Sequence, residues 1–188
     1  MKICKTTKIL KTLFPVALLL FATACANTHT NTTAANSAAL QELLDKTAIE
    51  ELLIDYYSQL GTGGKGFGDY YLEDSVLDVN GTIATGREGI ENLYKIAATG
   101  ADSPSLRGGT FRMMLNNTRI TVNGDSAKGD TIWVGIHSPE PTAMPVLIEH
   151  GRENDEFIKR DGRWYFKHRM ITSDSGLTGI FVETFIKR

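Results

Sequence analysis

The sequence predicts an α+β domain in which N-terminal helices cover one face of a curved antiparallel sheet. Two patterns predict this class. Apolar residues recur at helical spacing early in the domain. Four long strand-like segments fill its second half and form two pairs, one joined by a tight Asn-Gly turn and the other by a tight Asp-Gly turn. Composition agrees, because 188 residues with 41% hydrophobic and 22% charged side chains are typical of one globular domain.

Residues 1–24 predict an export signal. They comprise a basic start, an apolar run too short to span a bilayer, and small residues before Cys25. The segment from Ala22 to Cys25 resembles the lipobox of bacterial lipoproteins, whose cysteine becomes the lipid-modified N-terminus. Ordinary cleavage at the same bond is the alternative. We expect an exported protein of the bacterial envelope, anchored to the membrane through Cys25 and facing the periplasm.

Charge and cysteine content exclude several function classes. Four of the 20 Lys and Arg residues lie in the export signal, so the rest of the chain has 16 of them against 22 Asp and Glu. This acidic balance argues against a nucleic-acid partner. The two cysteines, Cys4 and Cys25, both precede the domain, which excludes thiol catalysis, disulfides and thiolate metal sites within it.

The chain divides into four parts. Residues 25–39 are small and polar, without Asp, Glu, Lys or Arg, and predict a flexible tether. The folded domain spans residues 40–173, and residues 174–188 form a C-terminal extension of unassigned position. Spacing of three and four residues predicts that the domain begins with an amphipathic helix, in one piece or two. Its apolar stripe comprises Leu40, Leu43, Leu44, Ile49, Leu52, Leu53, Tyr56, Tyr57 and Leu60.

Glycine-rich residues 61–68 end this helix. They predict a connection rather than a phosphate loop, since no strand precedes them and no Gly-Lys-Ser/Thr occurs. A short strand pair follows over residues 75–79 and 81–85. A capping box from Thr85 to Glu88 then predicts a second helix. Its apolar face comprises Ile90, Leu93, Tyr94 and Ala97.

Long strands dominate the rest of the domain. Turns at Asn123-Gly124 and Asp161-Gly162 predict two hairpins, and a longer loop over residues 138–145 joins them. The strands are expected at residues 110–122, 125–137, 146–160 and 163–173.

Strand alternation predicts which side chains share the covered face. We assume hairpins without bulges and place His137 opposite Leu147. The covered face then holds Arg112, Met114, Trp133, His137, Leu147, Glu149, Gly151, Glu153, Phe157, Trp164, Phe166, His168 and Met170. The opposite face is polar and holds Arg119, Thr121, His150, Arg152, Asn154, Glu156, Tyr165, Lys167 and Arg169.

The order and spacing of several segments resemble the SnoaL-like branch of the nuclear transport factor 2-like superfamily. The segments are residues 48–57, 69–79, 86–90, 116–127 and 161–166. The resemblance implies a cystatin-like cone of curved sheet and helices around an internal pocket for small, often apolar molecules. It also implies dimerisation through the outer face of the sheet.

Among relatives with known chemistry the chain is similar to scytalone dehydratase, which uses a histidine and aspartate pair and tyrosine-held water. His137 matches that enzyme's strand histidine, but Arg112 matches its other pocket histidine. Its helix aspartate falls on Leu60 or the glycines beyond, and its later serine and asparagine fall on Gly151 and Glu153. The inherited dyad is therefore broken.

Ionisable groups on the covered face are the candidate site, because charges in an apolar cavity are costly unless paired or used. His137 is the candidate general acid or base, with Glu153 or Glu149 orienting it. Arg112 is a candidate for holding an anionic group, or for an internal ion pair with Glu153. The further ligand-binding candidates are Tyr56, Tyr57, Tyr70, Trp133 and Trp164. We expect no metal site, because alternation sends His150 away from His137 and His168. We also expect no cofactor.

Three functions remain open from sequence alone. The first is binding of a small, partly apolar molecule in the cone pocket. The second is a cofactor-independent lyase or isomerase with His137 as acid or base. The third is an envelope protein-interaction domain that uses the outer sheet face.

Overall fold

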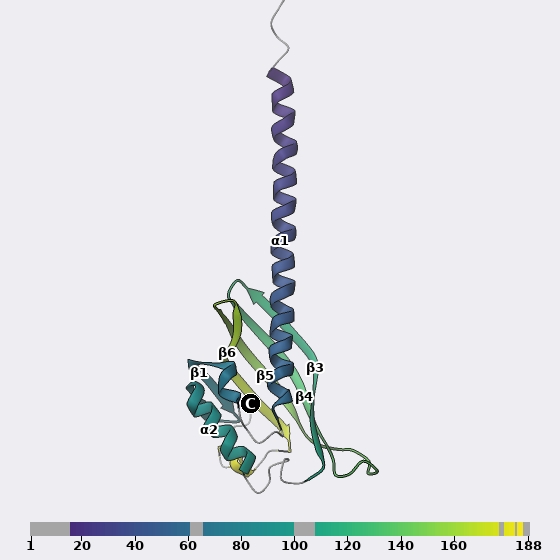
Figure 1. Cartoon of the computed structure of the whole chain (residues 1–188), viewed down its shortest axis with the longest axis vertical. Coiled ribbons are helices and arrows are strands. Elements are labelled where there is room, and N and C mark those ends of the chain that lie inside the picture. The colour runs from purple at the N-terminus through teal and green to yellow at the C-terminus, as the bar shows by residue number, and fades with distance from the viewer. Residues whose placement is uncertain (1–15, 61–65, 100–107, 177–178, 183, 186–188) are drawn as a thin grey trace, which may run out of the picture. The chain divides into compact units, whose positions relative to one another are not determined.

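The computed structural model describes residues 16–60, 66–99, 108–176, 179–182 and 184–185, with side chains from residue 34 onward (Figure 1). The chain divides into two compact units, Met1–Gln41 and Glu42–Arg188. Helix α1 (Val16–Ser58) runs through the boundary between them.

The described part of the first unit is helical. Its helix runs through residues 25–39, whose composition predicts a flexible tether. This stretch contains neither glycine nor proline, so nothing in it breaks a helix. Among the described residues, no helix is long and apolar enough to cross a membrane. Residues 1–15, which include the basic part of the predicted export signal, lie outside the described residues.

The second unit contains a six-stranded sheet with strand order β2-β1-β6-β5-β4-β3. The strands are β1 (Tyr71–Val79), β2 (Thr82–Thr85), β3 (Thr110–Asn123), β4 (Ser126–Ser138), β5 (Val146–Arg160) and β6 (Arg163–Ser175). The remaining elements are η1 (Phe67–Tyr70), α2 (Gly86–Thr99) and η3 (Gly179–Phe181). The α+β class and the four long strands are confirmed.

The sheet is mixed, whereas the sequence predicts a purely antiparallel one. β1 lies parallel to β6, with Leu77 opposite Arg169, and every other pair is antiparallel. Asn80 ends β1 in the left-handed region (φ 53°). Its side chain accepts a hydrogen bond from Ser173 N (2.9 Å) and donates one to Ser173 Oγ (3.0 Å), which fastens β1 to the end of β6.

The C-terminal half of α1 and helix α2 pack on the sheet. The buried core joins Ile49, Leu53 and Tyr56 of α1 to Phe157 and Phe166 of the sheet. Helix α2 contributes Ile90, and Leu93, Tyr94 and Ala97 pack against the same core, as predicted for its apolar face. The C-terminal extension adds Phe181, whose position the sequence leaves open.

A bulge in β3 reverses the predicted faces at its start. Asn116 faces Ile132 and Arg119 faces Asp130, so Asn117 and Thr118 of β3 together lie opposite the single residue Thr131 of β4. Asn117 at this bulge has a left-handed backbone (φ 53°). Arg112 and Met114 therefore lie on the outer face, and Phe111, Met113 and Leu115 on the inner one. The assignment of Arg112 to the covered face is wrong for this reason.

A second bulge has the same effect on β6. Phe157 faces Phe166, as predicted, but Glu156 faces His168, which leaves Lys167 unmatched. Beyond this point the parity of β6 changes. Arg169 turns inward and is fully buried, while His168 and Met170 turn outward, opposite to the prediction.

Candidate functional site

A buried charge cluster lies on the inner face of the sheet. Arg169 from β6 donates a hydrogen bond through Nη2 to Glu153 Oε2 of β5, and both side chains are fully buried. Asp155, two residues further along β5, places Oδ1 3.7 Å from Arg169 Nε. One guanidinium thus faces two carboxyl groups without contact with water.

The cluster has one more acid than base. Burial is the largest influence on the pKa of Asp155 and raises it well above its usual range, although Arg169 lowers it. Burial lowers the pKa of Arg169, but the Asp155 and Glu153 carboxylates outweigh burial and raise it. Glu153 has the closer contact with the guanidinium, so we assign the charged pair to Arg169 and Glu153. Asp155 is then the carboxyl group with the stronger tendency to hold a proton.

Aromatic rings enclose the guanidinium. The Arg169 Cζ atom lies 4.1 Å from the ring centre of Tyr56, 4.3 Å from that of Phe166 and 5.1 Å from that of Tyr57. Cations are stabilised over aromatic faces, most strongly when water is excluded. The rings therefore offset part of the cost of burying the charge and fix the plane of the guanidinium.

Tyrosine hydroxyls continue the polar network. The Tyr71 hydroxyl donates a hydrogen bond to the Tyr56 hydroxyl at 3.1 Å, and a second hydrogen bond joins the Tyr56 and Tyr94 hydroxyls. Burial raises the pKa of Tyr56, Tyr71 and Tyr94 above the ordinary tyrosine value of 10.0, so all three stay neutral at physiological pH.

Tyr57 connects the cluster to an open cavity. Its hydroxyl accepts a hydrogen bond from Arg169 Nη2 at 2.9 Å. Tyr57 also lines a cavity of about 720 Å³ between the end of α1 and the start of β3. The described lining residues are Ile54, Tyr57, Ser58, Leu60, Phe111, Arg112, Met113 and Leu115. The wall is thus mostly apolar, with hydroxyls at Tyr57 and Ser58 and a cation at Arg112.

The structure places the predicted ligand-binding residues in different environments. Tyr57 and Arg112 line this cavity, although Arg112 is exposed and donates from Nη1 to the carbonyl of its neighbour Phe111 (2.9 Å). Tyr56 is buried against Arg169, and Tyr70 is half-buried with its ring centre 5.4 Å from that of Tyr56. Burial raises the pKa of Tyr70.

The two tryptophans are buried in the protein interior. Trp164 donates from Nε1 to Asp45 Oδ1 at 3.0 Å. Trp133 packs over Gly151, where an added Cβ would lie 2.5 Å from the indole. Neither is among the residues that line the cavity.

His137 and Glu153 are far apart. Glu153 lies on β5 opposite Thr131 of β4. His137 lies six residues beyond Thr131 on β4, opposite Val146 of β5. Six strand residues span about 20 Å. His137 Nε2 instead lies 2.7 Å from the carbonyl oxygen of Gly108. The predicted contact between these two residues is wrong, and so is the predicted Arg112–Glu153 ion pair, since Glu153 binds Arg169. Glu149, opposite Gly135, is the nearer of the two predicted partners along the sheet.

Sequence reasoning missed Arg169 and Asp155. Asp155 shares the face of Glu153 by simple alternation, so that signal was present. Arg169 follows the β6 bulge, and alternation without the bulge sends it to the outer face.

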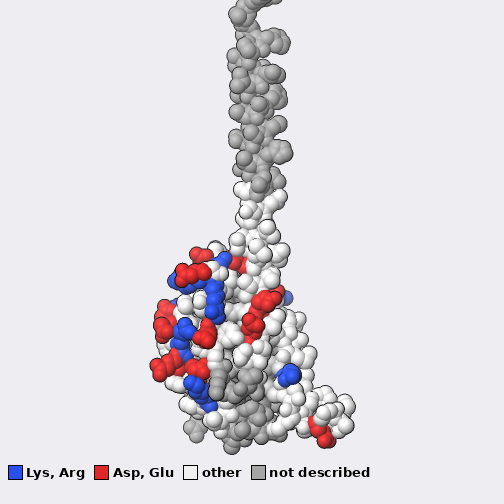
Figure 2. All heavy atoms as spheres, in the orientation of Figure 1, with Lys and Arg blue, Asp and Glu red and all other residues white. Residues whose placement is uncertain are grey.

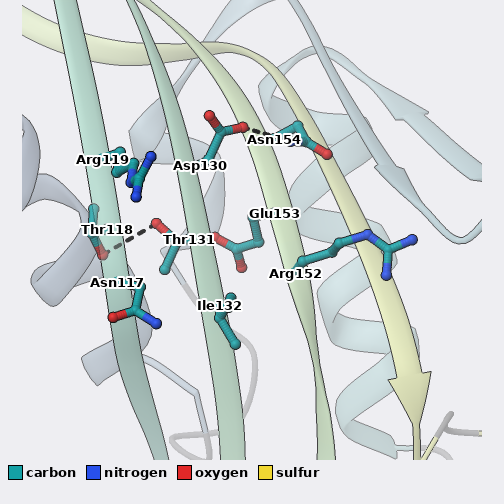
Figure 3. A pocket seen from close by; sticks show the side chains of 9 residues that line it. All are labelled: Asn117, Thr118, Arg119, Asp130, Thr131, Ile132, Arg152, Glu153 and Asn154. Carbon is teal, nitrogen blue, oxygen red and sulfur yellow. Dashed lines mark hydrogen bonds between the residues drawn. The ribbon is translucent and has the colours of Figure 1, made fainter.

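The outer face carries a second cavity, of about 610 Å³, around the β3 bulge (Figure 3). Its polar side chains include Asp130, which accepts a hydrogen bond from Asn154 (2.6 Å), and Arg119 and Arg152 on the flanking strands. No cluster of three or more potential metal ligands occurs among the residues that the structure describes.

Solved structures share this architecture, a cystatin-like α+β fold. One is a protein of unknown function with a cystatin-like fold from Nostoc punctiforme, with 22% identity, a TM-score of 0.59, and 71% of this chain and 94% of that one covered. Another is a nuclear transport factor 2-like protein from Novosphingobium aromaticivorans, with 18% identity, a TM-score of 0.59 and coverage of 80% and 95%.

A third structure, from the same species, has the proposed identity scytalone dehydratase. It shows 22% identity, a TM-score of 0.56 and coverage of 70% and 85%. No curated protein matches the sequence. The model of the SnoaL-like domain family matches residues 41–170. The chain belongs to this family, which confirms the resemblance inferred from sequence.

Proposed function

We propose that the domain binds a small, partly apolar molecule in the cavity between α1 and β3. The observation that carries the proposal is the composition of its wall. Five of the described residues that line about 720 Å³ are apolar, among them Ile54, Leu60 and Met113, and few polar groups are present to orient a ligand. Such a lining is typical of small-molecule sites. Figure 2 shows that the visible surface over β3 is mostly uncharged, whereas acidic and basic side chains are interspersed elsewhere.

Arg112 gives the site a preference for anionic ligands. Arg112 is exposed on the outer face of the edge strand β3 and is also among the residues that line the cavity, so its charge lies near the opening. There it would attract an acidic group on a molecule whose apolar body lies deeper. We therefore expect amphipathic aromatic acids to bind more tightly than their neutral analogues.

Substitution of two neighbouring methionines can test whether ligands bind in this cavity. Met113 lines the cavity, and Met114 points to the opposite face and is 49% exposed. Titration with 1-anilinonaphthalene-8-sulfonate should show binding to the native protein. Met113→Trp should weaken it about tenfold by filling the cavity, and Met114→Trp should not. Equal effects of the two substitutions, with unchanged circular dichroism, would contradict the proposal.

A ligand of the cavity can also be used to test for catalysis. A ligand recovered with the protein should be identified by mass spectrometry and incubated with native protein and with His137→Ala. Turnover to an eliminated or isomeric product, lost in the variant, would support a lyase or isomerase with His137 as acid or base. Binding without turnover would leave the domain a small-molecule binder.

We also propose export and lipidation at Cys25. The sequence supports this through the small residues before Cys25 and the apolar run that precedes them. Intact mass of protein purified from its own membranes should show a diacylglyceryl group. Cys25→Ser should remove it and Cys4→Ser should not. A processed native chain without lipid mass would favour ordinary cleavage.

A second copy of the chain is the partner that we propose for the outer sheet face. This face is less polar than predicted, because the β3 bulge turns Met114 outward opposite Val134, and Ile132 and Leu147 are also exposed. Ile132→Lys should shift a dimer toward monomer in sedimentation velocity. Ile83→Lys, an exposed position on β2, is the matched control. A native protein that sediments as a monomer at every concentration would contradict this proposal.

A further inference from the structure

The hydrogen bond that the Tyr57 hydroxyl accepts determines the direction in which the hydroxyl can donate its own proton. A tyrosine hydroxyl has one proton and accepts through its oxygen. Arg169 Nη2 donates to that oxygen at 2.9 Å, and a guanidinium has no acceptor for the hydroxyl proton. The proton of Tyr57 must therefore point away from Arg169. Among the described residues, no acceptor for it is found.

The guanidinium that imposes this direction is held on several sides. Glu153 binds the same Nη2 atom, Asp155 faces Nε, and the rings of Tyr56 and Phe166 lie against the guanidinium group. The Arg169 side chain is fully buried. Rotation would break the hydrogen bond to Glu153 inside the buried cluster, which is costly. The donor to Tyr57 is thus fixed before any ligand enters.

We propose that Tyr57 donates a hydrogen bond to a carbonyl, enolate or phenolate oxygen of the ligand, and that Arg169 is the residue that positions Tyr57. The inference rests on the proposed cavity, since Tyr57 is the residue shared by the cavity wall and the charge cluster. It narrows the ligand class to apolar or aromatic molecules with such an oxygen. A fixed donor stabilises negative charge on that oxygen more than a neutral oxygen.

A pair of probes isolates this hydrogen bond. 4-Nitro-1-naphthol carries an ionisable oxygen with visible absorbance, and 1-nitronaphthalene lacks that oxygen. In the native protein, the ionisation of bound 4-nitro-1-naphthol should shift toward the anion. Tyr57→Phe should reverse that shift and weaken naphtholate binding about tenfold or more, while 1-nitronaphthalene binding changes less than about twofold.

Matched variants separate donation from packing. Tyr71→Phe removes a buried hydroxyl that does not bond to Arg169, and it should leave the probe spectrum unchanged. Arg169→Lys keeps the charge without the guanidinium fork, and it should give an intermediate spectral shift with Tyr57 still present. Should this variant fail to fold, Tyr57→Phe still decides the question.

The outcomes distinguish the two proposals. If both probes bind and Tyr57→Phe weakens them equally, or leaves the ionisation of the naphthol unchanged, Tyr57 is a packing residue and the inference is wrong. If neither probe binds to the native protein, the proposed cavity function fails and the inference fails with it.

Discussion

Residues 152 and 153 are neighbours on β5, yet their side chains form ion pairs in opposite environments. Arg152 pairs with Asp174 on the outer face, where the side chains are 40% and 39% exposed. Glu153 pairs with Arg169 on the inner face, where both are fully buried. The inner pair is enclosed by aromatic rings, whereas the outer pair is partly exposed to solvent. The comparison indicates that the burial of an ion pair, more than the identity of its partners, determines how much free energy of unfolding is lost when one partner is removed.

Removal of the inner cation should have the largest effect. Arg169→Met leaves the buried Glu153 carboxylate without a counter-charge, so we expect the free energy of unfolding to fall by about 3–5 kcal/mol. Chemical denaturation followed by circular dichroism measures this loss. On the outer face, Asp174→Ala should cost about 0.2–1 kcal/mol. A similar loss from both variants would remove the distinction between the faces.

Packing on the inner face should rank second. Gly151→Ala places a methyl group 2.5 Å from the Trp133 indole and 2.2 Å from the Thr172 carbonyl oxygen. We expect a loss of about 1–3 kcal/mol in the same denaturation experiment. Gly89→Ala in helix α2 is the control, because nothing lies within 4 Å of its added methyl group. That variant should gain about 0.5–1 kcal/mol, and a loss there would undermine the steric explanation.

The protonated carboxyl of the inner cluster predicts a pH dependence. Burial raises the pKa of Asp155 in the folded protein, so the folded state retains a proton that the unfolded state releases above about pH 4. This contribution to stability is complete below that pH and is lost as pH rises through the raised pKa. The slope is at most about 1.4 kcal/mol per pH unit for one proton.

Asp155→Asn tests this slope, because its amide does not titrate. Unfolding free energies of the native protein and this variant, measured from pH 4 upward, should diverge in slope. Asp174→Asn on the outer face should retain the native slope. Parallel curves for the native protein and Asp155→Asn would show that Asp155 is ionised throughout.

The smallest effect is expected at an outer pair. Lys128 and Glu156 lie 3.3 Å apart with 79% and 50% exposure. A double-mutant cycle with alanine should give a coupling energy between about 0.2 and 1 kcal/mol, and it should shrink in high salt. A coupling comparable to that of the inner pair would contradict the proposed role of burial.

The strands were predictable from local chemistry, but their faces were not. Turns at Gly124 and Gly162 fix where the long strands begin and end. The bulges near Asn117 and Lys167 then change which side chains face inward. The apolar pattern of β3 contains a trace of this change, since Phe111, Met113 and Leu115 alternate in odd positions and Ile120 and Val122 in even ones. Strict alternation from the turn ignored that shift and misplaced Arg112.

The candidate site was predictable in part. Glu153 and Tyr57 were identified because both lie before or between the bulges, on segments where alternation and helical spacing hold. The partner of Glu153 was not, because Arg169 lies beyond the bulge in β6. Its burial also depends on Tyr56 and Phe166, residues distant in sequence whose rings make the buried cation tolerable.

The parallel pairing of β1 with β6 sets the order in which this domain can fold. β1 ends at Val79 and its neighbour begins at Arg163, and the Ser75 hydroxyl donates to the Phe166 carbonyl across 91 residues of chain (2.7 Å). Contacts of such separation form slowly because a long loop must close first. During synthesis, Glu153 and Asp155 emerge before Arg169 does. The central cation therefore arrives with the last strand, and until then the nascent chain cannot close its core.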